Sequence, residues 1–432
     1  MIQPLSPDVR RLVIVVRADP VICGHSGEAR NLAEAALRRG FDDVRILTWP
    51  LEAITELPLK PLDSVMPYSP GITVERPEPV GDYKVPDGRY CAGLTGRLIE
   101  LFTDGVPTAA LSLYLSPHAN VIAEAMSVAR AMKGDVPVTT YAEAVGSDIT
   151  NVVRSCVEEG RLGAAAHAFV TYLSNDVCVA VSEYTKELIV AAAEEVDALI
   201  GTTFAGECRE RVEISYPAIN TADFTETTDD EIDAVVAERD LVRDEYVLFL
   251  ARITPAKGVD DLLEGFATSE ARHHVRLVIA GTGKEREAMI GRADALGLGG
   301  RVSFFDDVGD DEKNALMAGS AAYVLPSKPR PEFTETFGIS IVEKMLAGGG
   351  PVVTTETGGI PEAVGDTATI VRPDCPADVA AAIDEVVLEI GPEERLARED
   401  KARTYAMQFD RQQVFDRLFG RGIWAISEAE VA

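Results

Sequence analysis

Short runs of apolar residues alternate along the chain with longer segments that are apolar at every third or fourth position. Residues 11–16 (RLVIVV) predict a buried strand, and residues 23–30 (CGHSGEAR) predict a glycine-containing loop. Residues 31–41 (NLAEAALRRGF) then predict a helix that ends at Gly40, and residues 42–49 (DDVRILTW) predict the next strand. This order describes a βαβ unit, whose two strands pair in parallel.

The same alternation starts again near Tyr246 and continues for about eighty residues. Strands are predicted in 246–253, 275–281, 301–305 and 321–326, with helices in 258–268, 284–297 and 310–320. Strands that alternate with helices form parallel sheets covered by helices on both faces. The pattern therefore predicts an α/β protein with two doubly wound, Rossmann-like domains.

The length of 432 residues also favours two domains over one. We place a first domain in 1–220, a second in 221–410 and a C-terminal helix, packed back on the first domain, in 411–432. Residues 57–90 carry seven prolines, which exclude helix and central strand and predict a long irregular insertion. Such an insertion is either functional or an inert surface loop.

Composition narrows the possible partners. The net charge of −30 disfavours nucleic acid and anionic membranes, although acidity of this kind also simply promotes solubility. The six cysteines form no CxxC motif, so we expect free thiols and no metal site. The N-terminal apolar run is too short for a signal peptide or a membrane span, which predicts a cytoplasmic protein without a stable membrane anchor.

The stretch 331–362 (PEFTETFGISIVEKMLAGGGPVVTTETGGIPE) places two carboxylates, Glu335 and Glu343, around the start of an apolar helix. Thr336 is the expected cap of this helix, and Gly348 its end. The first amides of a helix lack intrahelical acceptors and favour a phosphate. Carboxylates do not bind phosphate, so the two acids would bind hydroxyl groups of the same ligand. A phosphate between two polyols describes a nucleotide sugar.

Such a ligand needs cations as well. Arg252 and Lys257 follow the strand at 246–253, and open α/β sheets bind ligands at the carboxyl ends of their strands. The alternatives are ordinary: a solvated pair of loop cations, a surface acid at Glu335 and a buried salt bridge at Glu343.

These residues resemble a known family. Glu335 and Glu343, with Phe337-Gly338 between them, resemble the E-x7-E signature of retaining GT-B glycosyltransferases of glycosyltransferase family four, which include sucrose-phosphate synthases and the glycosyltransferase of mycothiol synthesis. The segments ARITPAKGVDDLLEGF, LVIAGTGKEREAM, YVLPS and TGGIPEAV follow in the family's order over roughly 150 residues. In the first half, GHSGEARNLAEAALRRGF resembles the family's glycine loop and first helix.

The resemblance implies a GT-B fold, in which two Rossmann-like domains face a central cleft and the second holds the donor. It implies that Arg252 and Lys257 bind the diphosphate, that Glu335 contacts the donor sugar and that Glu343 contacts the ribose. The remaining donor-binding positions that it implies are Gly24, Gly27, Gly281, Val308, Phe337, Gly338 and Ile339. Neither a metal ion nor another cofactor is implied.

The sequence departs from the family at one position. Many members carry a histidine before the segment Gly146-Ser147-Asp148, where this chain has Val145. His118, in the segment LSLYLSPHANVIAEAM, follows a predicted strand and is our catalytic candidate, although a structural role is an equal alternative. His25 and Asp148 are the other candidates on the acceptor side.

We therefore expect a retaining, metal-independent glycosyltransferase that acts on a nucleoside-diphosphate sugar and a small soluble acceptor such as a sugar, polyol, aminocyclitol or thiol. The insertion at 57–90 is the expected acceptor-recognition element. Secondary metabolism and compatible-solute synthesis both stay open, as does a homo-oligomer. The alternatives are a catalytically silent nucleotide-sugar-binding protein and a nucleotide-sugar 2-epimerase.

Overall fold

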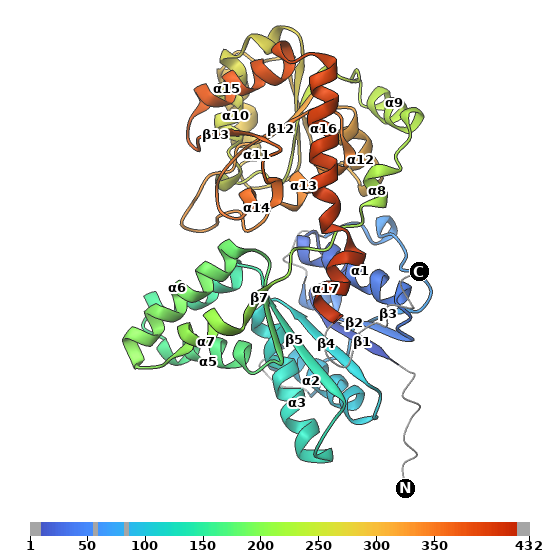
Figure 1. Ribbon diagram of the computed structural model, residues 1–432, viewed down its shortest axis with the longest axis vertical. Helices are drawn as coiled ribbons and strands as arrows, with labels where there is room; N and C mark the ends of the chain where they lie inside the picture. The colour runs from blue at the N-terminus through green and yellow to red at the C-terminus, as the bar shows by residue number, and fades with distance from the viewer. Residues whose placement is uncertain (1–9, 55–58, 82–85, 421–432) are drawn as a thin grey trace. The chain divides into compact units, whose positions relative to one another are not determined.

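The computed structural model describes residues 10–54, 59–81 and 86–420, and these residues form two compact units (Figure 1). Among these residues, unit 1 comprises those up to Ile219 together with those from Arg411 to Gly420. Unit 2 comprises Asn220–Asp410. The described chain contains no helix that is both long and apolar enough to cross a membrane.

Unit 1 is built on a seven-stranded sheet in the order β3-β2-β1-β4-β5-β6-β7, in which neighbouring strands are parallel. Leu12 and Ile14 of β1 pack into one buried cluster, and Val13 and Val15 pack into another on the opposite face. Burial on both faces explains why this strand is apolar from Leu12 to Val15, whereas its first residue, Arg11, is buried with Asp43 and Asp104 as ion-pair partners. The strands are β1 (Arg11–Val15), β2 (Asp43–Leu47), β3 (Ile72–Glu75), β4 (Thr108–Leu113), β5 (Val138–Ala144), β6 (Val177–Ala180) and β7 (Val212–Ile214).

Helices cover both faces of this sheet (Figure 1). They are α1 (Gly24–Arg38), α2 (Pro86–Thr103), α3 (Asn120–Lys133), α4 (Arg154–Glu158), α5 (Leu162–Leu173), α6 (Glu183–Ile200), α7 (Phe204–Arg211) and α17 (Arg411–Phe419).

The last of these helices, α17, packs beside α1. The ring of Phe415 meets Phe41 edge-on at 5.6 Å between centroids, and the ring of Phe419 lies 4.8 Å from Tyr141. An ion pair between Arg39 and Asp416 closes the contact. A segment at the end of the described chain thus completes the core of the unit that begins it.

Unit 2 repeats the architecture with a six-stranded parallel sheet in the order β10-β9-β8-β11-β12-β13. Its strands are β8 (Tyr246–Leu250), β9 (Arg276–Ala280), β10 (Val302–Phe305), β11 (Ala322–Leu325), β12 (Val352–Thr355) and β13 (Thr369–Val371). Its helices are α8 (Ala222–Thr225), α9 (Asp229–Glu238), α10 (Val259–Thr268), α11 (Arg286–Ala295), α12 (Asp310–Ala318), α13 (Ile339–Ala347), α14 (Ile360–Val364), α15 (Pro376–Asp384) and α16 (Pro392–Ala406). The prediction of two parallel-sheet α/β domains is confirmed.

The loop predicted in 23–30 is wrong, because α1 begins at Gly24. Its first turns bury Ser26 and Glu28 as well as Ala29. The polar side chains of Ser26 and Glu28 hide the helical apolar pattern that their burial would otherwise reveal.

The proline-rich segment is also more regular than predicted in its described parts. Ile72–Glu75 forms β3, an edge strand paired in parallel with β2, and α2 starts at Pro86. Prolines can flank an edge strand because one side of it carries no ladder hydrogen bonds. Residues 57–58 and 82–85 of the predicted insertion lie outside the described residues.

Two carboxyl groups interact in the core of unit 1. Glu28 on α1 and Glu143 on β5 are 3% and 0% exposed, and Glu28 accepts a hydrogen bond from the amide of Ala218 (3.3 Å). Burial raises the pKa of Glu28 from 4.5 to about 7. Burial and the neighbouring Glu28 raise the pKa of Glu143 well above its ordinary value. The pair therefore holds at least one proton in the folded protein near neutral pH.

Glu28→Gln should change the pH dependence of stability. A carboxyl whose pKa is raised on folding stabilises the fold fully below pH 4.5, and that contribution is lost as the pH rises through about 7. The unfolding free energy of the wild type minus that of the variant should fall by about 2–3 kcal/mol across this window, at about 1.4 kcal/mol per pKa unit. Urea unfolding at a series of pH values measures it. The exposed Glu187→Gln is the control, and parallel curves for Glu28→Gln and wild type would contradict the prediction.

A second buried charge-bearing group joins two helices of unit 2. Lys344 in α13 is fully buried, and its Nζ donates hydrogen bonds to the carbonyl of Met317 (2.7 Å), the hydroxyl of Ser320 (2.9 Å) and the carbonyls of Gly348 and Gly349. These acceptors lie at the C-terminal ends of α12 and α13, where helix carbonyls lack intrahelical donors. One lysine therefore caps both helices.

Lys344→Met should lower the free energy of unfolding of unit 2 by about 2–4 kcal/mol, because it leaves buried acceptors without a donor. Chemical denaturation followed by circular dichroism measures the loss. Lys401→Met is the matched control, since Lys401 forms a surface pair with Asp366 (2.8 Å) whose removal should cost no more than about 1 kcal/mol. Equal effects of the two variants would show that Lys344 does not cap these helices.

Candidate functional site

The carboxyl edge of the unit 2 sheet carries most of the predicted donor-binding residues. Arg252 follows β8, Lys257 lies in the helical turn Pro255–Lys257, Gly281 directly follows β9 and Val308 follows β10. The carboxyl ends of parallel strands share one edge of a sheet, so strand order places these segments on the same side of unit 2.

Lys257 and Glu335 form a buried ion pair, although 78 positions separate them in the sequence. They are 8% and 9% exposed. Arg252 is exposed and has no hydrogen bond or ion pair with another described residue. The structure therefore brings the predicted phosphate-binding lysine and sugar-binding acid together, and leaves the predicted arginine available to a ligand.

The helix after Glu335 begins later than predicted. Its first residue is Ile339, its cap is Gly338 with φ of 102°, and no side chain caps it. Thr336 as the cap is therefore wrong, and a left-handed residue that favours glycine turns the chain instead. The predicted end at Gly348 is confirmed. Phe337 is buried, and its ring packs edge-on against that of Phe409 with 5.0 Å between the centroids. This contact stabilises the turn at Gly338.

The glycines after this helix have a structural cause. A Cβ on Gly358 would clash with the carbonyl oxygen of Glu335, and one on Gly359 would clash with that of Thr336. The amide of Gly359 also donates a hydrogen bond to the Glu335 carbonyl (2.9 Å). The two glycines therefore let the loop after β12 hold the backbone around Glu335. Gly281 plays a similar part, since a Cβ there would clash with the carbonyl of Ala251.

Glu343, one turn into α13, forms an ion pair with Lys313 of α12 at 2.8 Å. The Lys313 ammonium also lies 5.2 Å from the ring centroid of Phe224. The salt bridge foreseen as the alternative for Glu343 is thus present, and a ribose would have to share the carboxylate with Lys313.

Two residues that the sequence analysis missed help to build this edge. Lys313 is one, and Tyr323 on β11 is the other. The Tyr323 hydroxyl bonds to the carbonyl of Leu250 (2.9 Å) and to the hydroxyl of Ser340 (3.1 Å). It thereby ties the end of β8, next to Arg252, to the first turn of α13. The apolar run of β11 gave no sign of this role.

In unit 1 the predicted residues gather at the carboxyl edge of the other sheet. Gly24 and Gly27 are exposed in the first turns of α1, and a side chain on Gly27 would meet no protein atom within 4 Å. His25 lies between them, and its ring centroid is 6.0 Å from that of Tyr114, which directly follows β4. His118 lies beyond Tyr114 on the same connection.

His118 is 2% exposed, and neither of its ring nitrogens has a hydrogen-bond partner among the described residues. Its ring packs edge-on against Trp49 (4.8 Å) and Tyr114 (6.0 Å). Burial, with the positive charges of Arg17 and His25, lowers the pKa of His118 to about 3. This imidazole is neutral at physiological pH and is a weak base, which makes it a poor general base in this state.

Asp148 accepts hydrogen bonds from the backbone around it. It is 1% exposed and accepts hydrogen bonds from the amides of Val145 (3.2 Å), Gly146 (3.0 Å), Ile149 (3.1 Å) and Leu115 (3.3 Å). Burial raises its pKa to about 6 against the effect of these bonds. The carboxylate holds the connections after β4 and β5 together, and the apolar Val145 beside it is buried.

The described part of the proline-rich segment is attached to α1. The Tyr68 hydroxyl donates to Asp19 (3.0 Å), and the Arg30 guanidinium lies 3.7 Å from the Tyr68 ring centroid while pairing with Asp19 at 2.7 Å. The segment is therefore fixed to the same edge of unit 1 as Gly24 and His25.

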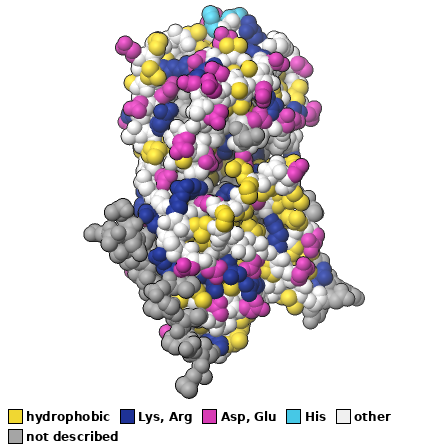
Figure 2. All heavy atoms as spheres, turned by 90° about the vertical axis from the view of Figure 1, so that its right-hand side faces the viewer, with side chains coloured by type: hydrophobic (Ala, Val, Ile, Leu, Met, Phe, Trp, Pro, Cys, Tyr) yellow, Lys and Arg dark blue, Asp and Glu magenta, His cyan; other side chains and the backbone are white. Residues whose placement is uncertain are grey.

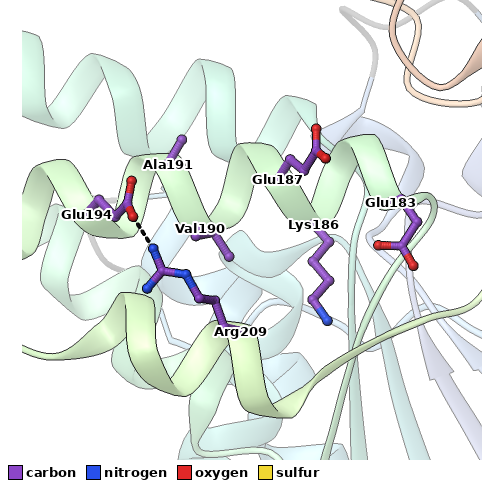
Figure 3. A pocket seen from close by; sticks show the side chains of 7 residues that line it. All are labelled: Glu183, Lys186, Glu187, Val190, Ala191, Glu194 and Arg209. Carbon is purple, nitrogen blue, oxygen red and sulfur yellow. Dashed lines mark hydrogen bonds and ion pairs between the residues drawn. The ribbon is translucent and has the colours of Figure 1, made fainter.

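One surface pocket lies elsewhere. Glu183, Lys186, Glu187, Val190, Ala191, Glu194 and Arg209 line a hollow of about 310 Å³ between α6 and α7 (Figure 3). It contains none of the predicted site residues, and its Arg209 already pairs with Glu194. We do not assign it a function.

The surface charge and the potential metal-ligating residues do not identify a further site among the described residues. Acidic and basic side chains are mixed over the face shown in Figure 2. Within the described ranges, no three His, Cys, Asp or Glu side chains are grouped so that they could hold a metal ion.

Comparison with known proteins identifies the fold. The chain superimposes on HepE of Anabaena, solved with UDP and glucose, with a TM-score of 0.66 and 16% identity over 94% of this chain and 98% of that one. Sucrose-phosphate synthase of Thermosynechococcus elongatus gives a TM-score of 0.64 and 18% identity over 95% and 97%. At these identities the likeness establishes the GT-B fold alone.

Sequence relatives cover only part of the chain. An uncharacterized glycosyltransferase of Methanocaldococcus jannaschii is 29% identical over 246 residues, which are 56% of this chain and 59% of that protein. The D-inositol 3-phosphate glycosyltransferase of Mycobacterium tuberculosis is 31% identical over 195 residues, or 43% and 38%. Residues 234–404 match the family described as Glycosyl transferases group 1. The chain therefore has the GT-B fold, and its second unit is similar in sequence to glycosyl transferases group 1.

Proposed function

We propose that the protein is a glycosyltransferase that takes a sugar from a nucleoside-diphosphate sugar, bound on unit 2, and transfers it to a small acceptor bound on unit 1. The observation that carries this proposal is the buried Lys257–Glu335 ion pair in front of α13. A cation and a helix N-terminus together fit a diphosphate, and a carboxylate beside them fits the hydroxyls of the attached sugar.

Donor binding would rearrange the existing Lys257–Glu335 ion pair. A diphosphate near Lys257 competes with Glu335 for the ammonium, and the released carboxylate can accept hydrogen bonds from sugar hydroxyls. Arg252 needs no such exchange, because it has no partner among the described residues. Phosphate binding should therefore cost less free energy at Arg252 than at Lys257. Arg252 can pair with phosphate directly, whereas Lys257 must first give up an existing partner.

Chemistry of this kind breaks the bond between the sugar C1 and the diphosphate oxygen. The acceptor oxygen then forms the new bond to C1, and its proton passes to the leaving diphosphate. We infer that the configuration at C1 is retained and that no metal ion is needed, because cations and a helix end can stabilise the leaving group. The neutral His118 and the hydrogen-bonded Asp148 agree with a mechanism that draws no base from unit 1. We also place the enzyme in the cytoplasm, where it would serve secondary metabolism or solute synthesis.

Proteins of similar fold support the donor class. HepE has been solved with UDP and glucose and also with UDP-glucose. A uridine nucleotide is accordingly the first donor to test. The silent binding protein and the 2-epimerase remain the alternatives that the product analysis must separate, because both would bind such a donor without forming a glycoside.

A panel of nucleoside diphosphates and their sugars should reveal one nucleotide that raises the melting temperature, since a ligand at 100 times its dissociation constant adds about 2.7 kcal/mol. Arg252→Gln should weaken this binding by about 1.5–3 kcal/mol, the value of a hydrogen bond to a charged group, without lowering the melting temperature of the free protein. Arg38→Gln, an exposed arginine of unit 1, is the control. Unchanged nucleotide affinity in Arg252→Gln would remove this residue from the site.

Substitutions of Glu343 and Glu335 should affect the binding of different ligands. Glu343→Gln should weaken the free nucleoside diphosphate and the sugar nucleotide alike, because its partner would be the ribose. Glu335→Gln should leave affinity for the free diphosphate intact, since it frees Lys257, and should lower kcat with the full donor by about a hundredfold or more. Calorimetry and steady-state kinetics measure the two effects. Equal losses for both ligands in both variants would refute this division of roles.

A further inference from the structure

We propose that the carboxyl edge of the unit 1 sheet holds an anion subsite centred on Arg17, and that the acceptor therefore carries a phosphate group. The identification of the bound molecule as the acceptor rests on the proposed function, whereas the anion subsite itself rests on the residues of unit 1.

Arg17 directly follows the last residues of the β1 run and is partly buried. Its guanidinium has no hydrogen bond or ion pair with another described residue. Neighbouring arginines behave differently: Arg11 pairs with Asp43 and Asp104, and Arg30 pairs with Asp19. In a chain with 71 acidic and 41 basic residues, a partly buried arginine without an acid is a cation kept available for a ligand. A guanidinium is suited to phosphate because its planar fork can donate two parallel hydrogen bonds.

Tyr114 forms the platform for this cation. The Arg17 guanidinium carbon lies 5.9 Å from the centroid of the Tyr114 ring. Tyr114 has φ of 100° and ψ of 135°, a conformation that residues with a side chain rarely adopt. Backbone strain of this kind concentrates at ligand sites, where the surrounding structure enforces it. Here it turns the chain directly after β4 and places the ring beside Arg17, His25 and His118.

His118 supplies a second, independent indication of a ligand. It is 98% buried, and its ring nitrogens form no hydrogen bond of ordinary geometry with the described residues, although the backbone of Leu113 and Tyr114 lies close to the ring. Its ring packs edge-on against the Tyr114 platform. Unsatisfied polar atoms at this degree of burial are uncommon. A neutral imidazole can donate one hydrogen bond to a phosphate oxygen and accept another from a hydroxyl.

The described acids near the cluster are engaged with other groups: Asp19, two positions after Arg17, pairs with Arg30 and accepts a hydrogen bond from Tyr68. The oxygens of Asp148, the closest acid to Tyr114 on the β5 connection, are occupied by backbone amides. Glu143 and Glu28 share their proton in the core below. Within the part of unit 1 that the structure describes, Arg17 and His118 thus lie among carboxylates that are already engaged, which favours an anion locally despite the net charge of −30.

Trp49 allows the subsite to be tested without knowing the acceptor. Its ring lies 4.8 Å from His118, and the chain has one other tryptophan, Trp424, outside the described residues. In a Trp424→Phe background, fluorescence therefore reports on unit 1. Titration with inorganic phosphate should give a saturable change that potassium chloride at matched ionic strength does not reproduce.

Arg17→Gln should weaken this response to phosphate at least about tenfold, and Arg17→Lys should weaken it less. Arg38→Gln removes the same charge at the far end of α1 and should titrate like the parent protein. A cooperative melt confirms that each variant is folded. An absent phosphate response in the parent protein, or an unchanged response in Arg17→Gln, would overturn the subsite.

Two further measurements keep the subsite separate from the donor site. Arg17→Gln should bind nucleoside diphosphate as the parent protein does, and an equal loss of both ligands would assign Arg17 to the donor instead and overturn the proposal. With a donor in hand, sugars should be compared with their 6-phosphates, and Arg17→Gln should abolish any preference for the phosphorylated form. A saturable phosphate response without any nucleotide binding would refute the glycosyltransferase and leave the anion subsite standing.

Discussion

The central strands of both sheets are buried on both faces, and this constraint decides where chemistry can occur. A strand such as β1, with all five residues buried, offers no position for a charged side chain that must meet a ligand. Charged and polar groups that can meet a ligand therefore lie at the points where strands end. Because the strands are parallel, those points coincide along one edge of each sheet. Arg252, Lys257 and Glu335 on unit 2 and Arg17, Tyr114 and His118 on unit 1 are all consequences of this arrangement.

The regular elements could be predicted because their sequence patterns are local. Apolar runs identified β1, β8 and β9, and glycines identified the ends of α1 and α13 closely. The failures have local causes too. Ser26 and Glu28 are buried polar residues, so the first turns of α1 resembled a loop. Prolines on both sides of β3 concealed an edge strand of only four residues.

The sites were predictable in residue type but not in pairing. Spacing and a family resemblance singled out Lys257, Glu335 and Glu343, but no local pattern shows that Lys257 meets Glu335 or that Lys313 meets Glu343. Such pairs depend on how distant segments converge, which spacing along the chain does not encode. Arg17 was missed for a different reason. Its importance lies in the partner it lacks, and the absence of a partner can be recognised only when its neighbours are known.

The course of the chain between the units has a consequence for biosynthesis. The chain leaves unit 1 after Ile219, builds the whole of unit 2, and returns at Arg411 to add α17 against Phe41 and Tyr141. Domains generally fold in the order in which they leave the ribosome. Unit 2 can therefore fold while unit 1 still exposes the aromatic surface that α17 will cover. During that interval the newly made protein carries an open apolar patch, the kind of surface that molecular chaperones bind.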